Sequence, residues 1–188
     1  MEEIRRYFEK EFGISPSDWA IFSSKLSRSV FPKKSKLLDL GDIENHLSFV
    51  EKGIVRLYIP KEDGDITFGF VFKGSFVSAY DSFLTQTASD YVVETISESV
   101  LWQLDHEDLQ DIYEKTSIGN LIGRKAGEEL FLKKSKREIA LLRDSAEQRY
   151  LQLFKERPEL IREIPLKYIA SYIGVTPQAL SRIRKRIS

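Results

Sequence analysis

A tight turn between two short helices, close to the C-terminus, is the most restrictive feature of the sequence. In the stretch IASYIGVTPQALSRI (residues 169–183), Gly174 permits a left-handed backbone at the end of the first helix. Thr176 can cap the second helix, and Pro177 takes its first position, where a missing amide hydrogen is harmless. The residue types therefore predict two helices joined by a chemically specified turn.

Both predicted helices have one apolar face, so each can be buried against the other. These apolar residues recur at helical spacing, and the one in the turn would fill the corner between the helices. They are Ile169, Ala170, Ile173, Val175, Leu180, Ile183 and Ile187.

The outward face of the second helix offers only hydrogen-bond donors and cations. Gln178, Ser181, Arg182 and Lys185 recur at i, i+3, i+4 and i+7, and Thr176 precedes them at the cap. Arg can bind guanine O6 and N7 together, Gln can bind adenine N6 and N7, and Ser can bond to either base. We therefore predict that these five residues contact double-stranded DNA.

The distribution of charge agrees with this prediction. Residues 165–188 contain five basic residues and no acidic one, which leaves 24 basic against 29 acidic residues in the rest of the chain. A neutral protein with a cationic end is expected to direct that end toward a polyanion.

Composition limits the remaining possibilities. The 188 residues are 41% hydrophobic, which is sufficient for one medium or two small packed domains. No cysteine is present, which excludes disulfides and cysteine nucleophiles and fits a reducing compartment. The start MEEIRRYFEKEF is not a secretory signal, and no run of about 18 apolar residues follows. We expect a cytoplasmic protein with no membrane partner.

The sequence contains no motif for metal binding or catalysis. His46 and His106 are the two histidines, and neither has a second ligand-spaced histidine nearby. The sequence shows no nucleophile and base pair, phosphate-binding Gly-rich loop or paired carboxylates. We expect no metal, no cofactor and no enzymatic activity.

Residues 30–104 predict a β domain. Glycines at 41, 53, 64 and 74 separate runs rich in β-branched and aromatic residues, as in an all-β sandwich or barrel. The stretch KEDGD at 61–65 predicts a hairpin connection. Two helices should come first, one over residues 2–12 and one capped by Ser15.

A long helix is predicted over about residues 117–142. At 1.5 Å per residue it would be about 38 Å long, and such a helix often pairs with a second copy of itself. The alternative is a surface helix lying on its own barrel. Ser145 and Gln148 have capping-box spacing, so the chain should change direction near 143–145. The apolar residues of the helix are Ile118, Leu121, Ile122, Leu132, Ile139 and Leu142, interrupted by Lys125, Glu128 and Ser135.

These segments together resemble the Crp/Fnr-type bacterial transcription regulators, especially short members. IPLKYIASYIGVTPQALSRIRK is similar to their C-terminal helix-turn-helix, and FVEKGIVRLYI with DGDITFGFVFKGSFV resembles their cyclic-nucleotide-binding-like β-roll. The likeness covers nearly the whole chain. It implies an α+β fold in three parts: a double-stranded β-helix (jelly-roll) domain with N-terminal helices at 1–116, a dimerisation helix at 117–143 and a helix-turn-helix DNA-binding domain at 144–188.

The resemblance also implies partners. A homodimer held by the 117–143 helix would place one recognition helix in each half of a near-palindromic operator, with half-sites about one DNA turn apart. RNA polymerase is a further partner that the resemblance allows. Many relatives continue into a β-hairpin wing, and this sequence ends at Ser188, so we expect the DNA-backbone contacts of a wing to be lost or replaced.

Cyclic-nucleotide-binding relatives hold the ligand with a Gly-Glu pair and an Arg that is followed by Ser or Ala. The corresponding positions here are Ser78-Ala79 and Ser89-Asp90, so both charged anchors are missing. We expect no cyclic AMP or cyclic GMP bound in the usual way. An unidentified small-molecule effector remains open, in a pocket lined by Tyr80, Phe83, Ser89 and Tyr91, although these residues could equally be ordinary core.

A second class of function stays open beside the DNA-binding regulator. In this alternative, the chain is a small-molecule-binding β-roll module or barrel enzyme whose helical tail serves only association. The outward Gln/Ser/Arg/Lys face separates the two hypotheses, because an association helix has no need of it.

Overall fold

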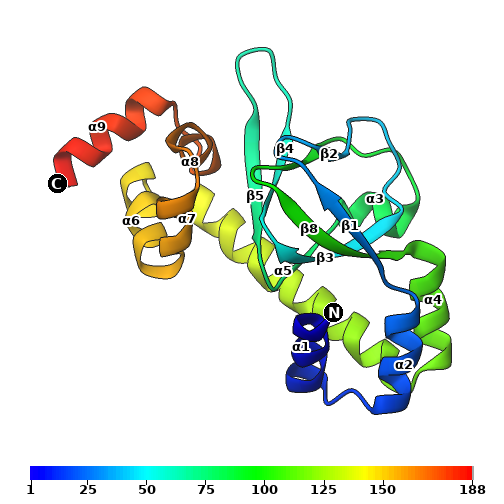
Figure 1. Cartoon of the computed structure of the whole chain (residues 1–188). Helices are drawn as coiled ribbons and strands as arrows, with labels where there is room; N and C mark the ends of the chain where they lie inside the picture. The colour runs from blue at the N-terminus through cyan, green and yellow to red at the C-terminus, as the bar shows by residue number, and fades with distance from the viewer. Residues whose placement is uncertain (188) are drawn as a thin grey trace. The chain divides into compact units, whose positions relative to one another are not determined.

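The computed structural model describes residues 1–187 and groups them into two compact units (Figure 1). The first unit contains Met1–Tyr58 and Phe70–Gly127, and the second contains Ile59–Gly69 with the chain from Glu128 onward. The three functional domains proposed from the sequence are a different division of the chain and remain a prediction.

Two antiparallel four-stranded sheets form the β-roll. One has the strand order β1-β8-β3-β6 and the other β2-β7-β4-β5. In the first sheet Val50 lies opposite Leu101, and in the second Leu57 lies opposite Val93. The strands are β1 (Ser27–Phe31), β2 (Lys36–Leu38), β3 (His46–Lys52), β4 (Ile54–Ile59), β5 (Ile66–Phe72), β6 (Phe76–Val77), β7 (Val92–Thr95) and β8 (Ser99–Asp105).

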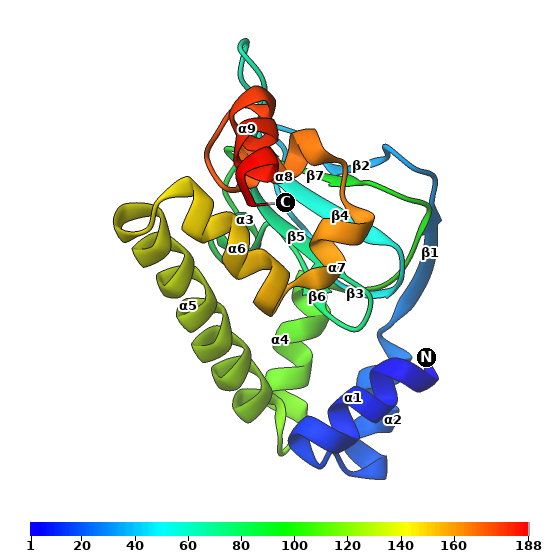
Figure 2. The same cartoon turned by 90° about the vertical axis from the view of Figure 1, so that its left-hand side faces the viewer.

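Helices α1 (Glu2–Phe12), α2 (Pro16–Ser24) and α4 (His106–Lys115) lie at one end of the roll (Figures 1 and 2). The predicted N-terminal helices are confirmed in detail. Gly13 ends α1 with a φ of 66°, and the Ser15 hydroxyl accepts a hydrogen bond from the Asp18 amide at 3.1 Å to cap α2. The helices form where the sequence predicts them because the capping residues lie at the ends of the apolar stretches.

The hydrophobic core of the first unit lies between these helices and the sheet that contains β3 and β8. It is aromatic-rich: the rings of Phe8 and Phe22 have centroids 4.5 Å apart, and those of Phe49 and Phe76 are 5.2 Å apart. Ile118 belongs to this core, so the segment leading into the long helix is fixed to the roll by apolar packing.

The predicted long helix is confirmed as α5 (Gly119–Arg143), which is 25 residues long. It ends where the predicted capping box begins: the Ser145 hydroxyl accepts from the Gln148 amide at 3.2 Å, and the Gln148 side chain accepts from the Ser145 amide at 2.8 Å. The two reciprocal bonds start a new helix and therefore end the continuous one.

The second unit contains four shorter helices, α6 (Ala146–Glu156), α7 (Pro158–Glu163), α8 (Leu166–Tyr172) and α9 (Pro177–Ile187) (Figure 2). Proline occupies the first position of α7 and of α9, where it costs no hydrogen bond. The buried apolar residues of these helices and of their caps are Tyr150, Leu153, Leu160, Ile164, Ile169, Ala170, Ile173, Leu180 and Ile183. The structure thus confirms a mixed helical and β fold with a jelly-roll-like domain and a long helix.

Candidate nucleic-acid interface

The turn between α8 and α9 has the geometry that its sequence predicts. Gly174 has a φ of 77°, and its amide bonds to the Ser171 carbonyl at 3.0 Å. The Val175 amide bonds to the Ala170 carbonyl, also at 3.0 Å. This pair of bonds is a Schellman motif, which satisfies two carbonyls at the end of α8 and fixes the direction in which the chain leaves it.

The start of α9 is fixed in the same local way. The Thr176 hydroxyl accepts a hydrogen bond from the Ala179 amide at 3.2 Å, so Thr176 is the cap that the sequence predicts. Leu180 and Ile183 are buried on the inner face of α9. The cap and the buried face together set which side of the helix points outward.

That outward side carries every residue predicted to contact DNA. Thr176, Gln178, Ser181, Arg182 and Lys185 are all exposed. Within residues 1–187, neither Arg182 nor Lys185 forms an intramolecular ion pair, whereas Arg186 pairs with Glu147 at 2.8 Å. Two cations of the exposed face are therefore available to an external anion. Their contact with DNA remains a prediction.

A shallow groove of about 510 Å³ runs beside this face, between α9 and the start of α6. Its floor is apolar and three cations stand around it. The lining residues are Ala146, Val175, Ala179, Arg182, Ile183, Lys185 and Arg186. Arg182 and Lys185 of the exposed face thus border an apolar groove that reaches Ala146 at the start of α6.

Two arginines hold the carbonyls at the end of α8. Arg137 of α5 donates from a terminal guanidinium nitrogen to the Tyr172 carbonyl at 3.0 Å, and its guanidinium lies 4.8 Å from the Tyr172 ring centroid. Arg149 of α6 donates to the Ile173 carbonyl at 2.9 Å. The last carbonyls of a helix lack partners within it, and cations near that end are favourable. Sequence reasoning missed both arginines, because nothing in their local sequence distinguishes them from solvent-exposed helix cations.

The second-unit part of α5 presents an apolar stripe to solvent. Leu132 is 66% exposed, Ile139 is 50% exposed and Leu142 is 84% exposed. With Ser135 they follow the alternating three- and four-residue spacing of a coiled-coil seam. An apolar stripe with this spacing is suited to packing against the same stripe of a second helix.

The four residues predicted for an effector pocket have structural contacts within the first unit. Phe83 is fully buried in the aromatic core, where its ring centroid lies 5.1 Å from that of His106. The buried Ser89 hydroxyl donates to the Tyr91 carbonyl at 2.9 Å. The Tyr91 hydroxyl donates to the Asp81 carboxylate at 2.5 Å, and burial with this bond raises the Tyr91 pKa. Tyr80 stacks on Phe83 with ring centroids 6.2 Å apart, and burial raises the Tyr80 pKa as well.

Tyr80 and Phe83 lie in α3 (Tyr80–Thr85), a helix that the sequence analysis did not predict, and Ser89 and Tyr91 follow it. It has only six residues, which is too short for an apolar stripe to repeat. The amide of Ala79, the residue before α3, instead bonds to Glu44, which is distant in the sequence.

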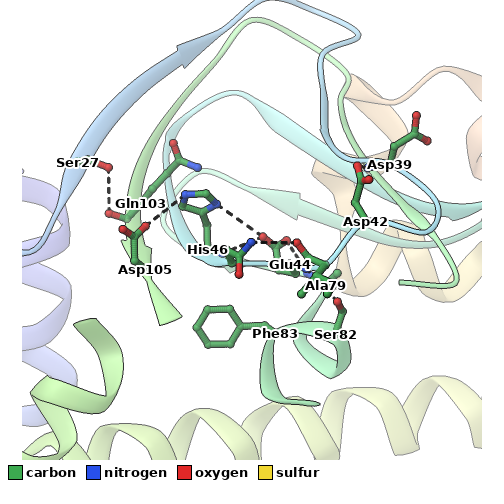
Figure 3. Close-up of polar contacts among 12 residues, drawn as sticks. Ser27, Asp39, Asp42, Glu44, His46, Ala79, Ser82, Phe83, Gln103 and Asp105 are labelled. Carbon is green, nitrogen blue, oxygen red and sulfur yellow. Dashed lines mark hydrogen bonds and ion pairs between the residues drawn. The ribbon is translucent and has the colours of Figure 1, made fainter. Parts of the chain in front are cut away.

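Glu44 is a buried acid that sequence reasoning also missed. It is 5% exposed, and its carboxylate accepts hydrogen bonds from the amides of His46 at 2.9 Å and Ala79 at 3.1 Å (Figure 3). Its own amide donates to the Ser82 hydroxyl at 3.0 Å. The carboxylate therefore ties the start of β3 to the residue that precedes α3. A Glu in the polar stretch GDIEN gives no signal of burial, so only the fold reveals it.

Burial controls the protonation of Glu44. Loss of water around the carboxylate raises its pKa, and the two amide hydrogen bonds and the nearby His46 oppose this shift only in part. The His46 ring itself lies toward Asp105, with Nε2 3.3 Å from a carboxylate oxygen (Figure 3). The His46 side chain thus lies between the carboxylates of Glu44 and Asp105.

The positions that carry charged anchors in cyclic-nucleotide-binding relatives are neutral or acidic here, as the sequence indicated. Ala79 uses its amide to bind Glu44, and the Ser89 hydroxyl is bonded within its own loop. The Ser78 hydroxyl is buried with no hydrogen-bond partner among the described residues. The segment 78–91 therefore offers an anion no cationic side chain.

Two further observations concern metal binding and membrane spanning. Among residues 1–187, no group of three or more His, Asp or Glu side chains is arranged to hold a metal ion. In that same part of the chain, every helix is too short or too polar to cross a lipid bilayer.

Comparison with known proteins agrees with this geometry. Residues 28–116 match the family model described as the cyclic nucleotide-binding domain. No curated protein matches the chain in sequence. Many solved structures match in fold, and the three described below are 16–18% identical in sequence.

Three of these structures illustrate the likeness. The c-di-GMP responsive global regulator CLP of Xanthomonas campestris is 18% identical with a TM-score of 0.69, over 92% of this chain and 91% of that one. A protein of Eubacterium rectale, described as a transcriptional regulator of the crp/fnr family, is 16% identical with a TM-score of 0.74, over 97% and 87%. FixK2 of Bradyrhizobium japonicum is 16% identical with a TM-score of 0.70, over 86% and 84%. Residues 28–116 thus form a domain similar to cyclic nucleotide-binding domains, in a chain that shares its fold with structures of Crp/Fnr-type regulators.

Proposed function

We propose that this chain is a sequence-specific DNA-binding transcription regulator. The observation that carries the proposal is the outward face of α9, where Gln178, Ser181, Arg182 and Lys185 are exposed on a helix fixed by a Schellman turn and a threonine cap. A helix that presents Arg, Gln and Ser beyond its capped N-terminus has the chemistry to read base edges in the major groove. The pair α8 and α9 would then act as a helix-turn-helix.

We propose further that the protein acts as a homodimer through α5. The exposed stripe of Leu132, Ile139 and Leu142 supports this, because burying such side chains contributes about 1.5–3 kcal/mol each. Two recognition helices related by a twofold axis would bind half-sites about 34–36 Å apart on a near-palindromic operator. RNA polymerase would be a further partner of such a regulator.

The roll is the proposed sensor domain, without the usual cyclic nucleotide chemistry. An incoming cyclic phosphate would meet no arginine at 78–91, and the Glu44 carboxylate already binds the Ala79 amide. The Asp90 carboxylate, at one of the positions of the missing anchor, would repel a phosphate at short range. Titration calorimetry with cyclic AMP and cyclic GMP should therefore show no heat of binding at micromolar protein, and saturable binding of either would contradict this part of the proposal.

Selection of bound sequences from random duplex DNA tests the central proposal. The full chain should enrich a motif with twofold symmetry, and gel filtration of the free protein should give the mass of two chains. Failure to enrich any sequence, at a salt concentration low enough for phosphate contacts to form, would contradict DNA recognition. An enriched motif without symmetry, together with a monomeric mass, would contradict only the dimer.

A further inference from the structure

The tip of one β-hairpin belongs with the C-terminal helices. Residues 59–69 contain the connection between β4 and β5 (Figure 1). They group with the chain from Glu128 onward, whereas residues 54–58 and 70–72 of the same strands belong to the first unit. The hairpin is therefore covalently part of the roll while its tip is part of the unit that holds α8 and α9.

Ser171 of α8 makes two hydrogen bonds to the backbone of this tip. The Ser171 hydroxyl donates to the Asp65 carbonyl at 2.6 Å and accepts from the Thr67 amide at 2.8 Å. Thr67 is fully buried. Both bonds are to the hairpin backbone, and a hydroxyl is the smallest side-chain group that can donate and accept at once. Neither alanine nor a cation could make this pair of bonds.

Ser171 is the first of three consecutive residues fixed by different elements. The hairpin tip binds Ser171, Arg137 of α5 binds the Tyr172 carbonyl, and Arg149 of α6 binds the Ile173 carbonyl. Gly174 and the turn into α9 follow immediately. Among these three contacts of the segment that precedes α9, the Ser171 contact is the one made by the hairpin of the roll.

We propose that Ser171 is a positioning residue for DNA binding, and that the hairpin tip 59–69 acts through it on α8 and hence on α9. The inference rests on the proposed function of α9. In the proposed mechanism the contact has two states, one with both hydrogen bonds made and one with both broken. A displacement of the hairpin where it joins the roll would change the fraction of molecules in which the bonds to α8 are made. With the contact broken, α8 and the turn must lose mobility on binding DNA, which weakens binding.

Three substitutions at one position test this. Ser171→Ala removes both bonds, Ser171→Thr keeps the hydroxyl, and Ser171→Cys keeps the size with a weaker donor and acceptor. Glu62→Ala is the matched control, since Glu62 lies exposed in the same hairpin tip and its side chain takes no part in these bonds. Circular dichroism confirms that each variant is folded at the temperature of the assays.

Two readouts are needed. Hydrogen exchange followed by mass spectrometry should show faster exchange of peptides covering 65–69 and 166–176 in Ser171→Ala, with peptides of β8 unchanged. Affinity for the selected operator should fall about threefold to tenfold in the same variant, which corresponds to the net contribution of one hydrogen bond or slightly more. Ser171→Thr should restore both values, Ser171→Cys should be intermediate, and Glu62→Ala should match the wild type.

The outcomes are distinguishable. Wild-type exchange and affinity in Ser171→Ala would overturn the role of Ser171 and leave the proposed function intact. Equal losses in the Ala and Thr variants would also overturn it, because they would show that packing rather than the hydroxyl is responsible. If the wild-type protein binds no DNA, the proposed function fails and the role of Ser171 in DNA binding fails with it, whatever the exchange data show.

Discussion

Arg149 donates from Nε to the carbonyl oxygen of Ile173 at 2.9 Å, and a second guanidinium nitrogen bonds to the Asp144 carbonyl. Asp144 lies at the junction of α5 and α6, and Ile173 closes α8 just before the turn into α9. One side chain thus joins the end of the long helix to the turn that orients the candidate recognition helix. The planar guanidinium suits this task because it directs several donors in fixed directions.

Replacing Arg149 by alanine should lower the free energy of unfolding by about 1.5–3 kcal/mol, since two carbonyls lose a charged donor. Arg149→Lys should recover part of the loss, because an ammonium can reach one carbonyl but not both in the same geometry. Urea denaturation measures the effect. Arg143→Ala is the control: the Arg143 side chain is 71% exposed, so its ion pair with Asp144 should be worth less than about 1 kcal/mol. Equal stability of the Arg143 and Arg149 variants would show that the junction does not depend on Arg149.

Gly174→Ala should destabilise the turn through its backbone alone. An added Cβ would lie 3.8 Å from both the Arg149 guanidinium and the Leu141 side chain, which is ordinary contact, so space is not the limit. The φ of 77° is the limit, and an L-residue with a Cβ is strained there by about 1–2 kcal/mol. Gly174→Asn should cost less than Gly174→Ala, since Asn tolerates the left-handed region better. Thermal unfolding monitored by circular dichroism would contradict this account if the two variants had the same midpoint.

The local features of the fold could be predicted from the sequence, whereas its long-range polar contacts could not. Gly13, the Ser145–Gln148 capping box and the turn at Gly174 were all predictable, because each depends on residues within six positions of one another. Contacts such as Glu44 to Ala79 or Ser171 to Asp65 join residues far apart in the chain. A polar residue in a polar stretch carries no sign that the fold will bury it.

The candidate site also combines local features that the sequence predicts with long-range contacts that it does not. The five residues predicted on α9 are exposed, because helical periodicity and one buried face determine which side points outward. The residues that make contacts at the end of α8, just before α9, are Arg137, Arg149 and Ser171, and only the structure revealed them. Periodicity indicates which face a residue takes, and it says nothing about which distant carbonyl lies within reach of its side chain.

Leu132→Lys should convert the proposed dimer to a monomer without unfolding the chain. Leu132 is 66% exposed, so the substitution places a charge in solvent when the chain is alone and in an apolar seam when two chains pair. Analytical ultracentrifugation should show a single-chain mass, with circular dichroism unchanged. Lys133→Ala is the control, because Lys133 is exposed one position away from the stripe and should stay dimeric. A dimeric Leu132→Lys variant would place the interface elsewhere.

The stability of the protein should depend on pH through Glu44. Its pKa in the folded protein is raised above the usual 4.5 by burial, so the folded chain holds this proton to higher pH than the unfolded chain does. The stabilising contribution is complete below pH 4.5 and is lost as the pH rises through the folded pKa. The wild-type protein should therefore lose stability relative to Glu44→Gln as the pH rises from 4.5 toward neutrality.

Urea denaturation of both proteins at several pH values measures this difference. The comparison is repeated in a His46→Gln background, because the His46 Nδ1 lies 4.0 Å from the Glu44 carboxylate. Parallel stability curves in both backgrounds would show that Glu44 ionises as freely in the folded chain as in the unfolded one.

Arg182 and Lys185 lie on one exposed face of α9, and replacing each by alanine should impair DNA binding in a different way. If Arg182 binds a guanine through O6 and N7, Arg182→Ala should weaken operator binding by about 1–3 kcal/mol and relax the preference at one base position. If Lys185 binds a phosphate, Lys185→Ala should weaken binding to all sequences alike and reduce the salt slope by about one unit. Each variant is therefore the control for the other. Binding to the operator and to scrambled DNA over a range of salt concentrations separates them, and matching profiles for the two variants would refute the division of roles on α9.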